Sequence, residues 1–259
     1  MKNRGVLLFA FNNERIDYLR IARYCAHRVR THWNLPVAVV TDQYKADGFD
    51  FVIPFSKTTG VSIRQYEEYG EGLSFYNLDR HRALNLSPFD ETILMDTDYL
   101  PNSSLLPSLW TTQPLLLTDQ AHSIGTHDLP VSLKKLSAIG PPMFWATLVL
   151  FNKVSPVAQR FFNEWSQVTK DYQHYSKVFQ LSDGTVRNDF AVSVAMHKMF
   201  GGTVPSGLRL PYSIPTALPE EQVKTLTPLT LSTCGPVPYD VHVFNKKSLL
   251  EAVCGLQGF

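Results

Sequence analysis

The sequence has few cysteines and no dominant charge. Its 259 residues include three cysteines, Cys25, Cys234 and Cys254, which lie far apart and match no metal-binding spacing. An odd number without a disulfide framework is typical of a reducing compartment. The formal net charge is +1, which excludes a global basic field for nucleic acid or an anionic membrane and leaves only a local patch possible.

Long apolar runs are also missing. The first apolar run, residues 5–11, is too short for the core of a signal peptide followed by a cleavage site. No stretch approaches the ~20 apolar residues that a membrane span needs. We therefore expect a soluble, cytoplasmic protein with no membrane partner.

A glycine-rich phosphate loop is absent from the start of the chain. The apolar run 5–11 predicts a buried strand, three- and four-residue spacing predicts a helix over 14–33 capped by Asn13, and residues 37–40 predict a second buried strand. Strand, helix and strand in about 35 residues form a right-handed parallel unit. The turn after the first strand reads Phe-Asn-Asn rather than G-x-G-x-x-G, which argues against a Rossmann-type dinucleotide site.

The remaining pattern predicts an α/β protein with a mixed, mainly parallel sheet flanked by helices in a single domain. Further strands are expected at 51–54, 92–95, 115–119, 143–151, 208–210, 229–231 and 240–247. Further helices are expected at 76–86, from Ser155-Pro156 to Tyr172, and from Arg187 to Gly201. Residues 56–74 and 120–142 are expected to be irregular.

Two aspartates form the centre of the sequence. Asp96 and Asp98 directly follow the buried strand 92–95, and side chains two residues apart in an extended backbone point the same way. Ligands of open α/β sheets bind at the carboxyl ends of strands. Two carboxylates there suit Mn²⁺ or Mg²⁺ shared with substrate phosphates. From these residues alone, a polar turn is an equal alternative.

Other charged residues are candidates for substrate contacts. Arg80 and Arg82 lie in the helix that precedes the aspartate-bearing strand, and a guanidinium is well shaped for a diphosphate. One of the two is expected to be an ordinary surface residue. Asp189 lies at a predicted helix start, where it is either a dipole partner or a substrate contact. His197 is expected to be a satisfied core histidine.

The order of these parts resembles the GT-A glycosyltransferases over most of the chain. Asp96-Thr97-Asp98 is similar to their D-x-D motif, which holds the metal that bridges the donor diphosphate. His242 to Lys246 is similar to the late H-x-x-G-x-x-K pattern of the glycogenin-like branch, although Asn245 stands in the neighbourhood of the glycine. The segments 82–99, 144–147 and 187–191 are more similar still to glycosyltransferases encoded by bacteriophages.

The resemblance implies a role for each candidate residue. Asp96, Asp98 and His242 would bind Mn²⁺ or Mg²⁺; Phe11, Thr41 and Asp42 would line the base and ribose pocket of a UDP-sugar; Thr97, Arg82 and Lys246 would contact the donor; Trp145 would offer an apolar face; and Asp189 would bind sugar hydroxyls or act as base. Residues 1–119 would form the nucleotide-sugar-binding half, and residues 120–259 the acceptor-side half with the late metal ligand.

The acceptor follows from analogy alone. Some bacteriophages transfer sugars to hydroxymethylated pyrimidines of their own DNA, so hydroxymethylated double-stranded DNA in the host cytoplasm is one expected acceptor. Saccharide or protein acceptors remain open, as does a nucleotide-sugar-binding protein without turnover. A sugar-nucleotide pyrophosphorylase is disfavoured, because such an enzyme needs the glycine-rich loop that is missing here.

Overall fold

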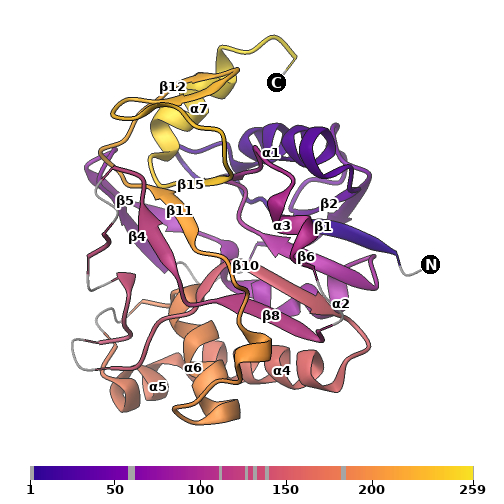
Figure 1. Ribbon diagram of the computed structural model, residues 1–259, viewed down its shortest axis with the longest axis vertical. Helices are drawn as coiled ribbons and strands as arrows, with labels where there is room; N and C mark the ends of the chain where they lie inside the picture. Colours follow the sequence, from indigo (N-terminus) through magenta and orange to yellow (C-terminus); the bar gives the residue numbers. More distant parts are fainter. Residues whose placement is uncertain are drawn as a thin grey trace.

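A six-stranded sheet forms the centre of the molecule. The computed structural model describes residues 3–57, 62–110, 113–125, 128–130, 133–137, 140–181 and 185–258. The sheet has the order β3-β2-β1-β6-β10-β8 (Figure 1). Its strands are β1 (Arg4–Phe9), β2 (Val37–Thr41), β3 (Phe51–Pro54), β6 (Glu91–Met95), β8 (Leu115–Thr118) and β10 (Trp145–Asn152).

The sheet is mixed and mainly parallel. Strands β3, β2, β1 and β6 pair in parallel, and β10 runs antiparallel to both β6 and β8. Helix α1 (Tyr18–Trp33) covers one face, and α4 (Pro156–Lys170) and α6 (Asn188–Phe200) cover the other (Figure 1). Both faces of the sheet are therefore buried, which is why its strands read as continuous apolar runs. The predicted α/β architecture, with a mixed, mainly parallel sheet flanked by helices, is confirmed.

The strand order reverses between β1 and β6. From β1 the chain moves outward through α1 to β2 and β3, and it then returns to place β6 on the other side of β1. A crevice outside the carboxyl ends of the strands at such a switch point is the usual ligand site of open α/β sheets. Asp96 is the first residue after β6, so the switch point lies at the predicted metal site.

A second sheet of short strands lies beyond the carboxyl end of β6. It has the order β7-β15-β11-β9, with β7 at Tyr99–Leu100, β9 at Ala121–Ser123, β11 at Ile214–Ala217 and β15 at Val241–Val243. Near the C-terminus, β12 (Val223–Leu226), β13 (Leu229–Leu231) and β14 (Gly235–Pro236) form a small antiparallel sheet. The remaining helices are α3 (Leu105–Ser108), α5 (Tyr172–Phe179), η1 (Asn77–Arg82), α2 (Ala83–Leu86), η3 (Ser206–Leu208) and α7 (Lys246–Cys254).

The predicted start of the first helix is wrong. Helix α1 begins at Tyr18 rather than near residue 14, because Asp17 caps it by accepting the amide of Arg20. Asn13 instead accepts the amide of Ile16 at 2.8 Å in the turn before the helix. Side chains of this type stabilise turns and caps by the same kind of bond.

Regular elements replace segments that were expected to be irregular or extended. The hairpin of β4 (Ser62–Tyr66) and β5 (Glu71–Phe75) takes up most of the segment predicted at 56–74, and β9 lies in the segment predicted at 120–142. The predicted strand 240–247 ends at Val243, since Asn245 caps α7 by accepting the amide of Ser248. Residues 208–210 form no strand, and a 3-10 helix ends at Leu208. The caps at Ser155 and Gly201 are confirmed.

None of the helices in the described ranges is long and apolar enough to cross a membrane. The division into a nucleotide-sugar-binding half (1–119) and an acceptor-side half (120–259) stays a prediction.

Candidate metal and substrate site

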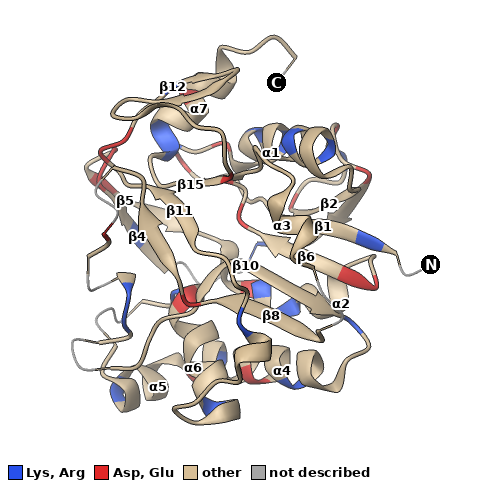
Figure 2. Ribbon diagram, in the orientation of Figure 1, with Lys and Arg blue, Asp and Glu red and all other residues tan. Residues whose placement is uncertain are grey.

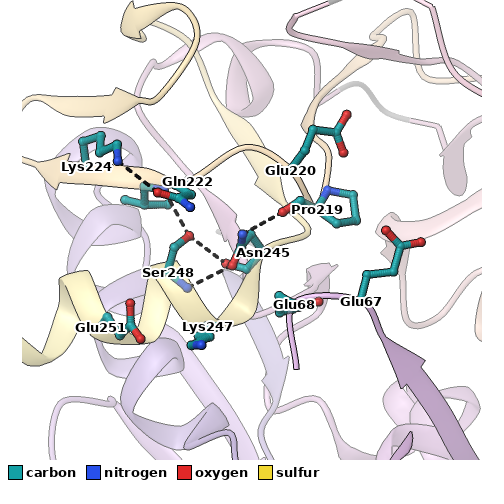
Figure 3. Close-up of a pocket in the computed structure, with 11 residues that line it drawn as sticks. Glu67, Glu68, Pro219, Glu220, Gln222, Lys224, Asn245, Lys247, Ser248 and Glu251 are labelled. Atoms are coloured by element: carbon teal, nitrogen blue, oxygen red, sulfur yellow. Dashed lines mark hydrogen bonds between the residues drawn. The ribbon is translucent and has the colours of Figure 1, made fainter. Parts of the chain in front are cut away.

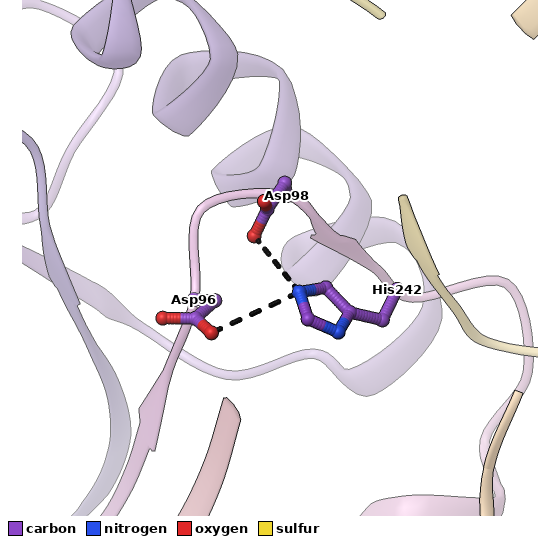
Figure 4. A group of neighbouring side chains, drawn as sticks. All are labelled: Asp96, Asp98 and His242. Atoms are coloured by element: carbon purple, nitrogen blue, oxygen red, sulfur yellow. Dashed lines mark ion pairs between the residues drawn. The ribbon is translucent and has the colours of Figure 1, made fainter. Parts of the chain in front are cut away.

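Asp96, Asp98 and His242 converge at the switch point of the sheet (Figure 4). The Nε2 atom of His242 lies 3.8 Å from Oδ2 of Asp96 and 3.5 Å from Oδ1 of Asp98. One ligand atom from each residue can be chosen so that all lie within 4.8 Å of one another. Residues separated by more than 140 positions in the sequence thus present two carboxylates and one imidazole to a common point.

The pairing of β7 with β15 brings His242 to the aspartates. Tyr99 follows Asp98 directly and is the register partner of His242 in the antiparallel pair. The amide of Val243 donates to the carbonyl of Asp98 at 2.9 Å. The strand pairing therefore fixes the position of His242 relative to Asp98.

These three residues fit a divalent cation. Oγ1 of Thr147 lies 3.4 Å from Nδ1 of His242, which leaves Nε2 directed at the carboxylates, as in metal sites whose second ring nitrogen is held by a neighbour. Hard cations take carboxylate oxygens. A neutral imidazole nitrogen is a further common metal ligand, so the set is compatible with a divalent cation.

Two basic side chains hold the carboxylates. Arg80 forms an ion pair with Asp96 and donates to the carbonyl of Ala146 at 2.9 Å. Lys246 forms an ion pair with Asp98. Burial raises the pKa of Asp98, but Lys246 and then His242 lower it by more, so that this pKa lies well below its usual range. Asp98 is therefore an anion at neutral pH although it is 5% exposed.

A cavity of about 750 Å³ contains this cluster. Most of the residues that the sequence singles out line it: Asp96, Thr97, Asp98, Trp145, Asp189, His242 and Lys246. The centroid of the Trp145 ring lies 6.3 Å from that of His242, and Oδ1 of Asp189 accepts the amide of Ala146 at 2.9 Å. The predicted catalytic residues thus share one cavity with the predicted metal ligands.

The other predicted site residues lie outside the lining of this cavity. Arg82 is exposed and its guanidinium stacks on Phe55 at 4.8 Å. Phe11 and Thr41 are buried, and Asp42 forms an ion pair with Lys57 at 3.0 Å. The structure therefore brings Arg80 rather than Arg82 to the aspartates, and the base and ribose contacts stay a prediction.

Sequence reasoning missed three residues that line the cavity: Arg64, Asn77 and Asn188. Asn188 is 4% exposed, and its Nδ2 donates to the carbonyl of Asn77 at 2.9 Å while its Oδ1 is buried without a partner. The free amide oxygen is suited to a hydroxyl donor on a ligand. The position of Asn188 beside Asp189 at a helix start is the feature of the sequence that could have identified it as a cavity residue.

A second hollow of about 660 Å³ adjoins the cavity (Figure 3). Both hollows are lined by Glu67, Glu68, Pro219 and Glu220. Glu67 and Glu220 are exposed, and acidic segments lie in the loop next to β5 (Figure 2). The boundary between the two hollows is therefore acidic.

Comparisons with known proteins give a partial similarity. No protein-family model and no curated protein sequence matches the chain. Among solved structures, the chain is similar to the glycosyltransferase GlyE of Streptococcus pneumoniae TIGR4, with a TM-score of 0.45 and 11% sequence identity. The similarity covers 78% of this chain and 44% of that chain, so this chain spans less than half the length of that protein.

Proposed function

We propose that this protein is a metal-dependent glycosyltransferase that moves a sugar from a UDP-sugar to an acceptor hydroxyl. The observation that carries the proposal is the convergence of Asp96, Asp98 and His242 at the switch point of the sheet, inside a cavity that also contains Trp145 and Asp189. A carboxylate pair at a strand end with a basic surround is suited to a metal-bound diphosphate.

The cation would neutralise charge on the leaving diphosphate. The residues of the chain prepare that site. Arg80 holds Asp96 by an ion pair and is itself anchored to the carbonyl of Ala146. Lys246, already at Asp98, is a second cation beside the developing charge of the leaving group. Preorganised charges of this kind stabilise a transition state without reorganising during the reaction.

Trp145 and Asp189 would position the sugar and the acceptor. Trp145 is 3% exposed and packs against both His242 and Phe244, with ring centroids 6.3 and 6.4 Å away. Its ring is therefore fixed beside the metal ligands. The carboxylate of Asp189 is oriented by the amide of Ala146, and Arg187 lies 3.6 Å from its second oxygen. An oriented carboxylate in this cavity is suited to bind a sugar hydroxyl or to accept the proton of the acceptor.

The acceptor is proposed in two forms. Hydroxymethylated DNA, the acceptor implied by the bacteriophage resemblance, stays a prediction. The acidic boundary formed by Glu67, Glu68 and Glu220 opposes a polyanion, because like charges repel across a shared surface. This boundary favours the alternative of a saccharide or protein acceptor.

Release of UDP tests the proposed activity. The wild-type protein is incubated with Mn²⁺ and a panel of UDP-sugars, and Asp98→Ala is the matched variant. We expect UDP release with at least one donor, and loss of more than about 100-fold in the variant, since a ligand to the catalytic metal is removed. Unchanged turnover in Asp98→Ala would show that the metal assignment is wrong.

Mass spectrometry separates the acceptors. Hydroxymethylcytosine DNA, a mixture of oligosaccharides and a denatured protein are each incubated with the enzyme and the active donor. A mass gain on nucleosides supports the DNA acceptor. A gain only on a saccharide or on protein supports the acceptor class that the acidic boundary favours. Donor binding with no UDP release from any donor would instead indicate a nucleotide-sugar-binding protein.

A further inference from the structure

Arg64 lies on the β4–β5 hairpin and lines the same cavity as Asp96 and Asp98. The hairpin is fixed to the start of α1 by several polar contacts. The hydroxyl groups of Tyr18 and Tyr66 lie 2.9 Å apart, and Nδ2 of Asn13 donates to the carbonyl of Ser74 at 3.0 Å. The backbone that carries Arg64 is therefore held in place at the cavity wall.

No carboxylate of the described residues forms an ion pair with Arg64, and Asp189 acts on it only from a longer distance. Three other cations of the cavity are paired: Arg80 with Asp96, Lys246 with Asp98, and Arg187 with Asp189. Within the described ranges, Arg64 forms no ion pair, and its Nε is buried without a hydrogen-bond partner. Arg64 as a whole is half-buried, but a buried donor without a partner on a cation is costly, and this cost falls when an anion binds.

The guanidinium of Arg64 is oriented by the aromatic ring of Phe75 and not by a carboxylate. Its Cζ lies 3.3 Å from the centroid of the Phe75 ring, so that the ring holds one face by a cation–π contact. The N–H groups lie in the guanidinium plane and point away from that face. Burial lowers the pKa of Arg64, and Arg187 adds to this while Tyr66 and Asp189 oppose it. An arginine nevertheless stays charged at neutral pH.

We propose that Arg64 binds an anionic oxygen group of the donor substrate, either its diphosphate or a carboxylate on its sugar. The identity of the donor rests on the proposed function. The need for an anion rests only on the unpaired guanidinium and its place in the cavity. A planar fork of N–H donors matches both phosphate and carboxylate.

Calorimetry of four ligands tests the proposal. Wild-type protein, Arg64→Gln, Arg64→Lys and the control Arg160→Gln are titrated in Mg²⁺ with inorganic pyrophosphate, UDP, UDP-glucose and UDP-glucuronate. Arg160 is exposed, lies on α4 and is outside the cavity. Melting temperatures of all four proteins check that they are folded. We expect Arg64→Gln to bind at least one of the anions with an affinity lower by about 10-fold or more. Arg64→Lys should retain part of the affinity, and Arg160→Gln should bind all four ligands as the wild type does.

The two sources of the anion give different patterns. Weaker binding of pyrophosphate, UDP and both UDP-sugars in Arg64→Gln indicates the diphosphate. Weaker binding of UDP-glucuronate alone indicates a sugar carboxylate. Equal affinities of wild type and Arg64→Gln for all four ligands would overturn the proposal, as would a wild-type protein that binds none of them. If the wild type binds pyrophosphate but no uridine ligand, the UDP-sugar function fails while pyrophosphate still tests Arg64.

Discussion

Tyr99 and His242 are register partners in the antiparallel pair of β7 and β15. Tyr99 is also the residue after Asp98, so this one pairing holds the imidazole Nε2 3.5 Å from Oδ1 of Asp98. Buried contacts also fix the side chain of Tyr99, because its hydroxyl oxygen lies 2.9 Å from the hydroxyl oxygen of Tyr212 and 3.3 Å from Oδ2 of Asp240. Asp98 and His242 are thus positioned by buried contacts behind them.

Asp240 is expected to stabilise this arrangement strongly. It is fully buried and accepts the amides of Asn102 and Ser103, each at 2.7 Å. Asp240→Ala leaves both donors unsatisfied, and we expect a loss of about 3 kcal/mol in the free energy of unfolding by urea. Asp240→Asn keeps one acceptor oxygen and should lose less than half as much. Asp47→Ala, at an exposed position, is the control. Equal stability of Asp240→Ala and wild type would contradict this account.

Arg80 and Arg82 are expected to differ sharply in their effect on activity. Arg80 is 2% exposed and is bonded to Asp96, whereas Arg82 is exposed on Phe55. Arg80→Gln leaves Asp96 without its partner, so we expect UDP release to fall by about 100-fold or more. Arg82→Gln should stay within about 0.5 kcal/mol of wild-type stability and keep its activity. The reverse order of effects would favour the sequence-based prediction that Arg82 contacts the diphosphate.

His242 and Thr147 should affect metal affinity to different degrees. His242→Ala removes a nitrogen ligand, while Thr147→Val removes only the hydroxyl 3.4 Å from Nδ1 of His242. We expect the first change to weaken Mn²⁺ binding by more than about 100-fold and the second by about 10-fold, since groups that orient a ligand have the smaller effect. Competition with a fluorescent chelator measures both. A wild-type affinity for Mn²⁺ in His242→Ala would show that His242 is not a ligand.

The Asp98–Lys246 pair predicts a pH dependence of stability in protein treated with chelator. Burial raises the pKa of Asp98, yet Lys246 and His242 lower it overall. The ionised Asp98 therefore stabilises the fold at pH values above the pKa of an aspartate in the unfolded chain, which is about 3.9. This stabilisation is lost as pH falls through the lower folded pKa. Burial lowers the pKa of Lys246, but Asp98 raises it overall, and that contribution is lost only as pH rises above about 10.4.

Lys246→Met should therefore be less stable than wild type at pH 7. The difference between the two proteins in the free energy of unfolding should become smaller below pH ~4. Urea midpoints at pH 7 and pH 3 measure this difference. Lys247→Met is the matched control, because Lys247 is the exposed neighbour on α7. A difference that does not change with pH would mean that the ion pair does not stabilise the fold.

The sequence predicts the sheet and the aspartate pair because both depend on strong local patterns. Continuous apolar runs identify β1, β2, β6 and β10, and the Asp-x-Asp spacing places two carboxylates on one side of the chain. His242 was predicted from the resemblance alone. Its approach to Asp98 depends on the β7–β15 pairing, and β7 is only Tyr99–Leu100, too short to show a pattern.

The cavity wall was harder to predict. In β4 the apolar Ile63 is exposed, while the charged Arg64 lies against Phe75 and lines the cavity. Buried positions are therefore not the apolar ones, as they normally are in a half-buried strand. The helix before β6 is 3-10 over Asn77–Arg82. In a 3-10 helix, as in an α-helix, residues two positions apart lie on different sides, so the sequence predicts that one of Arg80 and Arg82 faces away from the aspartates but not which one.

Binding of Mn²⁺ tests the central claim most directly. Wild-type protein and Asp98→Ala are titrated with Mn²⁺ in the presence and absence of UDP, and free Mn²⁺ is followed by electron paramagnetic resonance. We predict one Mn²⁺ per wild-type chain, bound more tightly when UDP is present, and no such site in Asp98→Ala. Equal Mn²⁺ binding by both proteins, or a wild-type affinity that UDP does not change, would contradict a metal centre built to hold a diphosphate.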